Sequence, residues 1–149
     1  MGVDSPVAGR AGAVRIQRLG GVALSAAEAH GKRLDVNGRA RAVTEAEPLS
    51  TTGLDLGRLY EAHAEGAKIS KSGTKALHMV LQFPTELVNG DRADMMLFHA
   101  RTFAQSIFGS SAVFADRVDR DEKSRHVVDL FIAPKYDKQT KRQTQRAIS

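Results

Sequence analysis

Three side chains of the types that bind divalent cations lie together near the C-terminal end of the sequence. Asp119, Glu122 and His126 fall between two apolar stretches, in a short acidic segment. Two carboxylates and an imidazole, with no thiolate, favour Mn or Mg, and Zn or another transition metal is the alternative. Asp129 is a possible fourth ligand, although side-chain alternation along a strand turns it away from His126 unless a bulge intervenes. The alternative is a solvated charged turn.

The elements that must position this cluster are predicted by the apolar pattern. Strands are expected at 13–19, 76–83, 111–118 and 126–133, and helices at 25–34, 54–67 and 91–108. Ser25 and Glu28 have the spacing of a capping box. The last helix is expected to bury the apolar positions Met95, Leu97, Phe98, Phe103 and Ile107. This order predicts an α+β fold: a single antiparallel sheet with helices packed mainly on one face, as in the ferredoxin-like split arrangement.

The length of 149 residues predicts one domain, which we place at residues 12–134. Residues 1–11 are rich in Gly, Ala and Ser and are expected to be flexible, and residues 135–149 to form a basic tail. The sequence contains no cysteine, which excludes a disulfide framework, a thiolate metal site and a cysteine nucleophile. With no signal peptide or apolar membrane span in the sequence, we expect a soluble, cytoplasmic protein.

The net charge of +5 is concentrated at the two ends of the chain. Residues 1–44 carry seven Lys or Arg and three acids, and residues 135–149 carry five and one, whereas residues 45–134 carry ten and thirteen. Basic segments around an acidic middle suit a polyanion such as nucleic acid. An ordinary solvated tail is the alternative.

The acidic segment resembles the metal motif of the MobV, or Pre/Mob plasmid recombination, family of mobilisation relaxases, which belongs to the HUH-endonuclease superfamily. That motif reads His-x-Asp-Glu-x-x-Pro-His-x-His. Asp121, Glu122 and His126 are in register with its Asp-Glu and the first downstream His, while Asp119 stands at the leading His and Val128 at the last one.

The resemblance extends along the chain from about residue 12 to 148. Residues 13–19 resemble the opening strand of the family, and His30 with Arg33 matches its His-x-x-Arg motif. The resemblance implies the HUH relaxase fold, with His30 as the nucleophile that forms a phosphoramidate with the 5′ end of nicked DNA and Arg33 beside it. The divalent metal, Mn or Mg, would polarise the phosphate.

The function implied is site- and strand-specific nicking of DNA at an origin of transfer by metal-assisted transesterification, which initiates conjugative mobilisation. The partner would be DNA, as a single strand and the adjacent duplex. Such relaxases are usually longer, so we expect a chain truncated from a longer bacterial protein that dimerises through a missing C-terminal region. We expect no membrane contact from this domain. Phosphate contacts are expected from Arg15, Arg18, Lys32, Lys68, Lys71 and Lys75.

Two other functions remain open from the sequence. A DNA-binding module of the same fold could have lost catalysis with the two motif histidines. A rolling-circle replication initiator would use a tyrosine, and Tyr60 is then the nucleophile, although its helical spacing with Leu56 predicts a core position. His63, His78 and His99 are expected to be structural or solvated, with His78 the one that its strand could bring toward the site.

Overall fold

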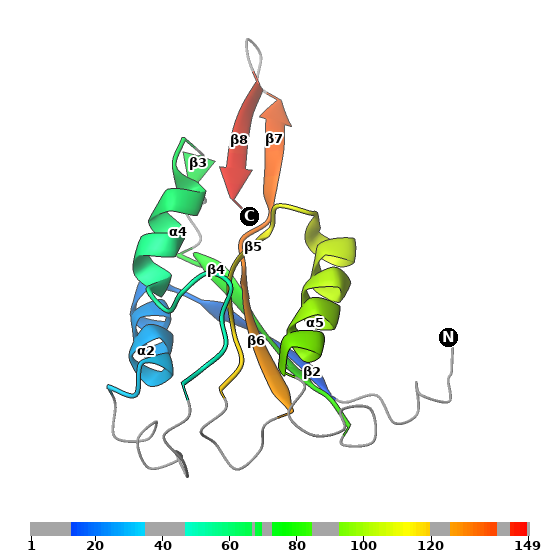
Figure 1. The fold of residues 1–149 in the computed structure, drawn as a ribbon. Coiled ribbons are helices and arrows are strands. Elements are labelled where there is room, and N and C mark those ends of the chain that lie inside the picture. The colour runs from blue at the N-terminus through cyan, green and yellow to red at the C-terminus, as the bar shows by residue number, and fades with distance from the viewer. Residues whose placement is uncertain are drawn as a thin grey trace.

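A four-stranded antiparallel sheet forms the centre of the molecule (Figure 1). The computed structural model describes residues 13–34, 47–66, 68–69, 73–84, 93–119, 126–139 and 144–148, the last two strands and 68–69 by their backbone alone. The strand order is β2 (Val14–Leu19), β4 (Ala76–Gln82), β6 (Val127–Ile132), β5 (Val113–Arg117). All three pairings are antiparallel, which confirms the predicted α+β class.

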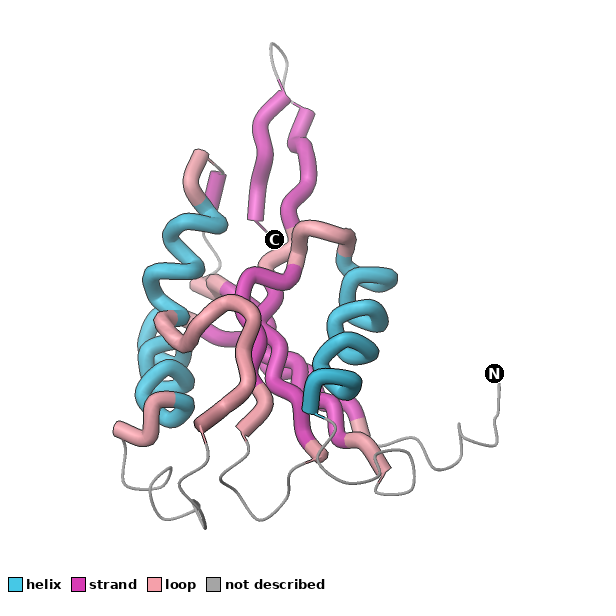
Figure 2. Tube along the Cα trace, viewed as in Figure 1, coloured by secondary structure: helices cyan, strands magenta, loops and turns pink. Residues whose placement is uncertain are grey.

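Helices cover both faces of this sheet (Figures 1 and 2). Helices α2 (Gly21–Gly31) and α4 (Leu56–Ala64) lie over one face, and α5 (Ala93–Phe108) lies over the other. Side-chain alternation divides each strand between two cores, so that Leu130 packs on the α5 side and Phe131 on the α2 and α4 side. Helices α2 and α4 share one face of the sheet, as predicted, and α5 forms a separate layer on the other face.

Helix α5 buries a different stripe from the one predicted. Met95, Phe98, Phe103 and Ile107 are exposed, and of the expected residues only Leu97 is buried. The buried residues are Ala93, Met96, Leu97, Ala100 and Ala104. Three alanines at helical spacing let the helix axis approach the sheet closely, and this fixes which side of the helix faces inward.

Helix α2 begins four residues before the predicted capping box. Its N-cap is Gly20, which makes no side-chain capping bond, and Ser25 lies inside the helix. Glu28 instead accepts hydrogen bonds from the backbone N–H of Gly57, at 2.8 Å, and from Lys32 Nζ, at 3.1 Å. The acid therefore ties α2 to the start of α4.

A second, three-stranded sheet has the order β3 (Lys68–Ile69), β8 (Thr144–Ile148), β7 (Lys135–Gln139). Residues 135–149 were expected to be a tail, but their described parts pair as an antiparallel hairpin that projects beyond the main sheet (Figure 1). Within the described residues, no helix has both the length and the apolar character that crossing a bilayer requires.

A buried carboxylate on β5 joins the loop before α4 to helix α5. Asp116 accepts hydrogen bonds from the Thr51 backbone N–H, at 2.7 Å, from the Thr51 hydroxyl, and from Ser50 Oγ, at 3.1 Å. Arg101 Nη1 lies 2.8 Å from Asp116 Oδ2. Because these donors come from separate segments, Asp116 fixes the loop and the helix against the same edge strand.

We predict that Asp116→Asn lowers the free energy of unfolding by about 2–3 kcal/mol, less than for a fully buried pair because Arg101 keeps part of its side chain in water. Urea denaturation measures the change. Glu61→Gln, at an exposed position on α4, is the control and should shift stability by less than about 0.5 kcal/mol. Equal effects of the two substitutions would contradict the role of Asp116.

Candidate functional site

Four residues in register cross the sheet on the face that α2 and α4 cover. Arg15 on β2 pairs with Val80 on β4, Val80 with Asp129 on β6, and Asp129 with Arg117 on β5. Paired residues of neighbouring antiparallel strands point to the same face. The register therefore places two arginines and a carboxylate on one surface.

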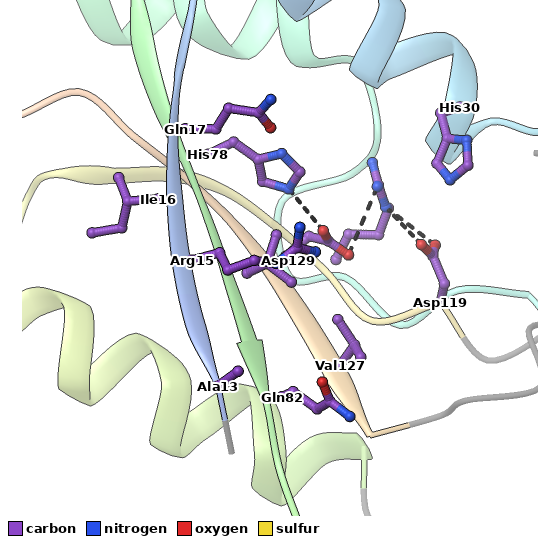
Figure 3. Close-up of a pocket in the computed structure, with 12 residues that line it drawn as sticks. Ala13, Arg15, Ile16, Gln17, His30, His78, Gln82, Asp119, Val127 and Asp129 are labelled. Carbon is purple, nitrogen blue, oxygen red and sulfur yellow. Dashed lines mark hydrogen bonds and ion pairs between the residues drawn. The ribbon is translucent and has the colours of Figure 1, made fainter. Parts of the chain in front are cut away.

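Above this row lies a cleft of about 710 Å³. Its lining includes Arg15, His30, His78, Asp119 and Asp129 (Figure 3). The sheet provides the floor, and His30, near the C-terminal end of α2, enters from the helix layer (Figure 3). Two histidines, two carboxylates and basic side chains thus share a single hollow.

His78 is held in the cleft by a carboxylate and an aromatic ring. Its Nε2 lies 2.7 Å from Asp129 Oδ1, and its ring stacks on Phe131 with centroids 4.6 Å apart. Because an ionised carboxylate only accepts hydrogen bonds, Nε2 carries the proton. The pair has the geometry of an imidazole oriented by a carboxylate, which is the arrangement used to move protons in catalysis.

Asp129 remains ionised although it is buried. Burial by itself raises the pKa of Asp129, but the hydrogen bond from His78, the positive charge of Arg117 and the electrostatic effects of His78 and His30 outweigh it and hold the pKa below its ordinary value. The cleft floor therefore carries a stable negative charge beside the guanidinium of Arg117.

Arg117 lies between the two cleft carboxylates. Its Nε is 3.1 Å from Asp119 Oδ1, its Nη2 is 3.8 Å from Asp129 Oδ2, and its side chain is only 5% exposed. Its Nη1 donates to the Ala27 carbonyl oxygen on α2, at 3.3 Å. A Cβ atom added at Gly31 would lie 2.3 Å from Nη1, so only glycine leaves room for the guanidinium there.

The end of α2 is closed by a Schellman motif that carries an arginine where glycine is usual. The backbone N–H of Leu34 donates to Ala29 O and that of Arg33 donates to His30 O, at 2.8 and 3.1 Å. Arg33 has φ +58°, in the left-handed region. Its Nη1 also donates to His30 O, at 2.8 Å, and its Nη2 lies 3.8 Å from Asp119 Oδ1. Arg33 therefore links the backbone of His30 to a cleft carboxylate.

The structure brings together part of the predicted site. His30, Arg15, Asp119 and Asp129 line the same cleft, and Arg33 contacts Asp119 from beside it. His126 is described but is not among the cleft-lining residues, because β6 directs Val127 and Asp129, two positions apart, into the cleft. Glu122 lies outside the described residues.

The predicted phosphate contacts are dispersed. Arg18 is three residues after Arg15 on β2, and an odd separation along a strand turns it to the opposite side of the sheet. Lys32 Nζ is 2.5 Å from Asp55 and 3.1 Å from Glu28. Lys75 lies over the ring of Tyr60, away from the cleft. Lys68 is described by its backbone alone, and Lys71 lies outside the described residues.

Tyr60 is a core residue, as its spacing predicted. It is 2% exposed and packs edge-to-face on Phe114, and burial raises the pKa of its hydroxyl, with a smaller contribution from Glu61. The hydroxyl has no hydrogen-bond partner among the residues the structure describes. It lines a second hollow with Arg58 and Lys75 and is not part of the His30 cleft.

Sequence reasoning did not find Arg117 and gave His78 only a minor place. Both had a signal, since each is a polar residue inside an apolar strand: Arg117 in Val-Phe-Ala-Asp-Arg and His78 in Ala-Leu-His-Met-Val. A charged residue in such a strand is buried only if it is paired. The register that pairs Arg117 with Asp129 cannot be read from spacing within one strand.

The described donors do not fit a divalent cation as they stand. Among the residues the structure describes, no three His, Asp or Glu side chains are close enough together to hold a metal ion. The two carboxylates that face the cleft, Asp119 and Asp129, both lie against the guanidinium of Arg117. A positively charged group therefore already occupies the space between them.

Solved structures of a relaxase domain share this fold. The Mn-bound MobM relaxase domain (MOBV; Mob_Pre) with plasmid pMV158 oriT DNA, at pH 5.5, is 14% identical over 82% of this chain and 69% of its own, with a TM-score of 0.64. The form at pH 4.6 gives 13% identity over 87% and 74%, with a TM-score of 0.65. The chain has the fold of a MobV relaxase domain. No family model matches the sequence. No curated protein matches it either.

The left-handed backbone of Arg33 predicts a difference between two substitutions that remove the same side chain. Arg33→Gly should leave the protein more stable than Arg33→Ala by about 1 kcal/mol, because only glycine takes this conformation without a steric penalty. Thermal denaturation of both variants measures the difference. Equal stability would contradict the conformation described for Arg33.

The lowered pKa of Asp129 predicts a pH-dependent contribution to stability. A carboxyl whose folded pKa lies below its unfolded value of about 3.9 stabilises the fold above that pH, and the contribution is lost as pH falls through the folded pKa. Asp129→Asn should therefore destabilise the protein by roughly 3 kcal/mol near neutral pH and by progressively less below about pH 4. Denaturation across this range tests it, and a pH-independent difference would contradict it.

Proposed function

We propose that this chain nicks one strand of DNA at a plasmid origin of transfer by transesterification, with His30 as the nucleophile. The observation that carries the proposal is the position of His30 in a cleft that also holds arginines, carboxylates and a second histidine. The fold is shared with a relaxase domain that was solved bound to oriT DNA. Such a nick would initiate the mobilisation of a plasmid.

The step forms one bond and breaks another. An imidazole nitrogen of His30 attacks phosphorus, the P–O3′ bond breaks, and the 5′ phosphate stays on His30 as a phosphoramidate. The imidazole loses its remaining ring proton and the departing 3′ oxygen gains one, so protons balance. His78, oriented by Asp129 in the same cleft, is the group placed to carry that proton.

Positive charge for the scissile phosphate has two candidate sources. The sequence assigned it to Mn or Mg held by Asp119, Glu122 and His126. The described geometry offers the guanidinium groups of Arg15 and Arg117 at the cleft, with Arg33 beside it. Arginine binds phosphate through paired N–H donors, so the exposed Arg15 can also position a single DNA strand.

We predict that His30→Ala lowers the rate of nicking by about three orders of magnitude or more, because no other group in the proposed mechanism attacks phosphorus. The substrate is a supercoiled plasmid carrying the DNA that flanks the gene for this chain, and conversion to the open circle is measured on a gel. His99→Ala is the matched control, since His99 is exposed on α5 over the opposite face. Mass spectrometry of the trapped adduct should place the 5′ phosphate on His30.

Tyr60→Phe distinguishes the rolling-circle initiator. Nicking should be unchanged, because Tyr60 is outside the cleft, and stability should be unchanged or higher since its buried hydroxyl lacks a partner among the described residues. Loss of nicking in Tyr60→Phe with retention in His30→Ala would overturn the proposal.

A binding-only DNA module is the second candidate function. The observation that favours it is the pairing of both cleft carboxylates with arginine, which leaves the described donors without a metal site. Binding of the plasmid by the protein, without conversion to the open circle either in EDTA or with added Mn or Mg, would support this function.

A further inference from the structure

We infer that the cleft carries its own cation. The guanidinium of Arg117 takes the place between Asp119 and Asp129 that a divalent ion would take, and the chain acts on DNA without a metal bound there. The first part concerns the cleft alone, and the second rests on the proposed nicking function. This departs from the Mn or Mg expected from the sequence.

The first step is the position of the charge. The Arg117 side chain lies within 3.1 Å of one carboxylate oxygen of Asp119 and 3.8 Å of one of Asp129. All three side chains are largely buried, at 5%, 11% and 11% exposure. A buried arginine is tolerated only when its charge is compensated, and the two carboxylates provide that compensation.

The second step is that the surroundings are shaped around the guanidinium. Nη1 donates to the Ala27 carbonyl oxygen, the group lies 5.6 Å above the Phe131 ring, and the missing Cβ of Gly31 leaves the space for it. These contacts come from two positions on α2 and one on β6, so the Arg117 side chain cannot leave its place without losing several of these contacts at once. Its place is therefore fixed by the fold.

The third step is electrostatic. A divalent ion between Asp119 and Asp129 would stand beside a buried positive charge, and repulsion between like charges is strong where water is excluded. Asp129 Oδ1 also accepts the hydrogen bond from His78 Nε2, at 2.7 Å. Its two oxygens therefore face two donors already, which opposes metal coordination.

The first experiment measures Mn²⁺ binding by electron paramagnetic resonance on the full chain, with no DNA. The unaltered protein should leave the signal of free Mn²⁺ unchanged at equimolar metal. Arg117→Met removes the charge and keeps an apolar stem, so it should bind Mn²⁺ at least about tenfold more tightly than the unaltered protein. Stoichiometric binding by the unaltered protein that Asp129→Asn abolishes would overturn the inference, whatever the nicking assay shows.

Gly31→Ala gives the same test without deleting the arginine. Its Cβ would meet Nη1 and Cζ of Arg117 at 2.3 and 2.9 Å, so the guanidinium must move from the carboxylates. Gly21→Ala, at the other end of α2, meets Lys75 only at 3.7 Å, an ordinary contact, and is the matched control. Mn²⁺ binding gained in Gly31→Ala but not in Gly21→Ala supports the inference, and no gain in either folded variant together with none in Arg117→Met counts against it.

The second experiment measures nicking of the supercoiled plasmid in EDTA and in Mn²⁺. Rates within about twofold of each other are expected if Arg117 supplies the charge. Nicking that requires Mn²⁺ would overturn the inference and leave the proposed function intact. Absence of nicking in both conditions, with no Mn²⁺ bound by the protein, would overturn the proposed function and leave the occupied cation position standing.

Discussion

The pairing of Arg117 with two carboxylates is the interaction on which the cleft depends. Arg117 starts on the edge strand β5, reaches Asp129 on β6 and Asp119 just after its own strand, and bonds the backbone of α2. One side chain thus joins the sheet to the helix that carries His30. Breaking a buried ion pair of this kind is more damaging than replacing all of it, because the remaining charges are left uncompensated.

Helix α2 is positioned by charge at several points along its second half. Glu28 bonds the backbone of Gly57, Lys32 pairs with Asp55, and Ala27 accepts from Arg117. The pKa of Glu28 is lowered, first by the Gly57 N–H and then by Lys32, against the opposing effect of burial. Contacts of α2 with both α4 and the sheet therefore fix the orientation of His30, in addition to the apolar packing of α2.

The order of strands and helices could be predicted from sequence because apolar periodicity is a local property. The antiparallel sheet and the core position of Tyr60 followed from it, whereas the relaxase-like fold followed from the resemblance of two motifs to the MobV family. The predicted buried side of α5 was wrong. Side-chain size suggested that the phenylalanines are buried, whereas close packing against the sheet buries the alanines. Arg117 was missed as a site residue and His78 was given only a minor place, because pairing across strands is set by register, which no single segment encodes.

The row of Arg15, Val80, Asp129 and Arg117 spans more than one hundred positions of the chain. Contacts this distant in sequence close slowly, since chain entropy must be lost before they form. During synthesis on the ribosome, β2 must wait until β4 and then β6 have emerged before the cleft floor is complete. A nascent chain therefore carries His30 long before it has the surface that His30 faces.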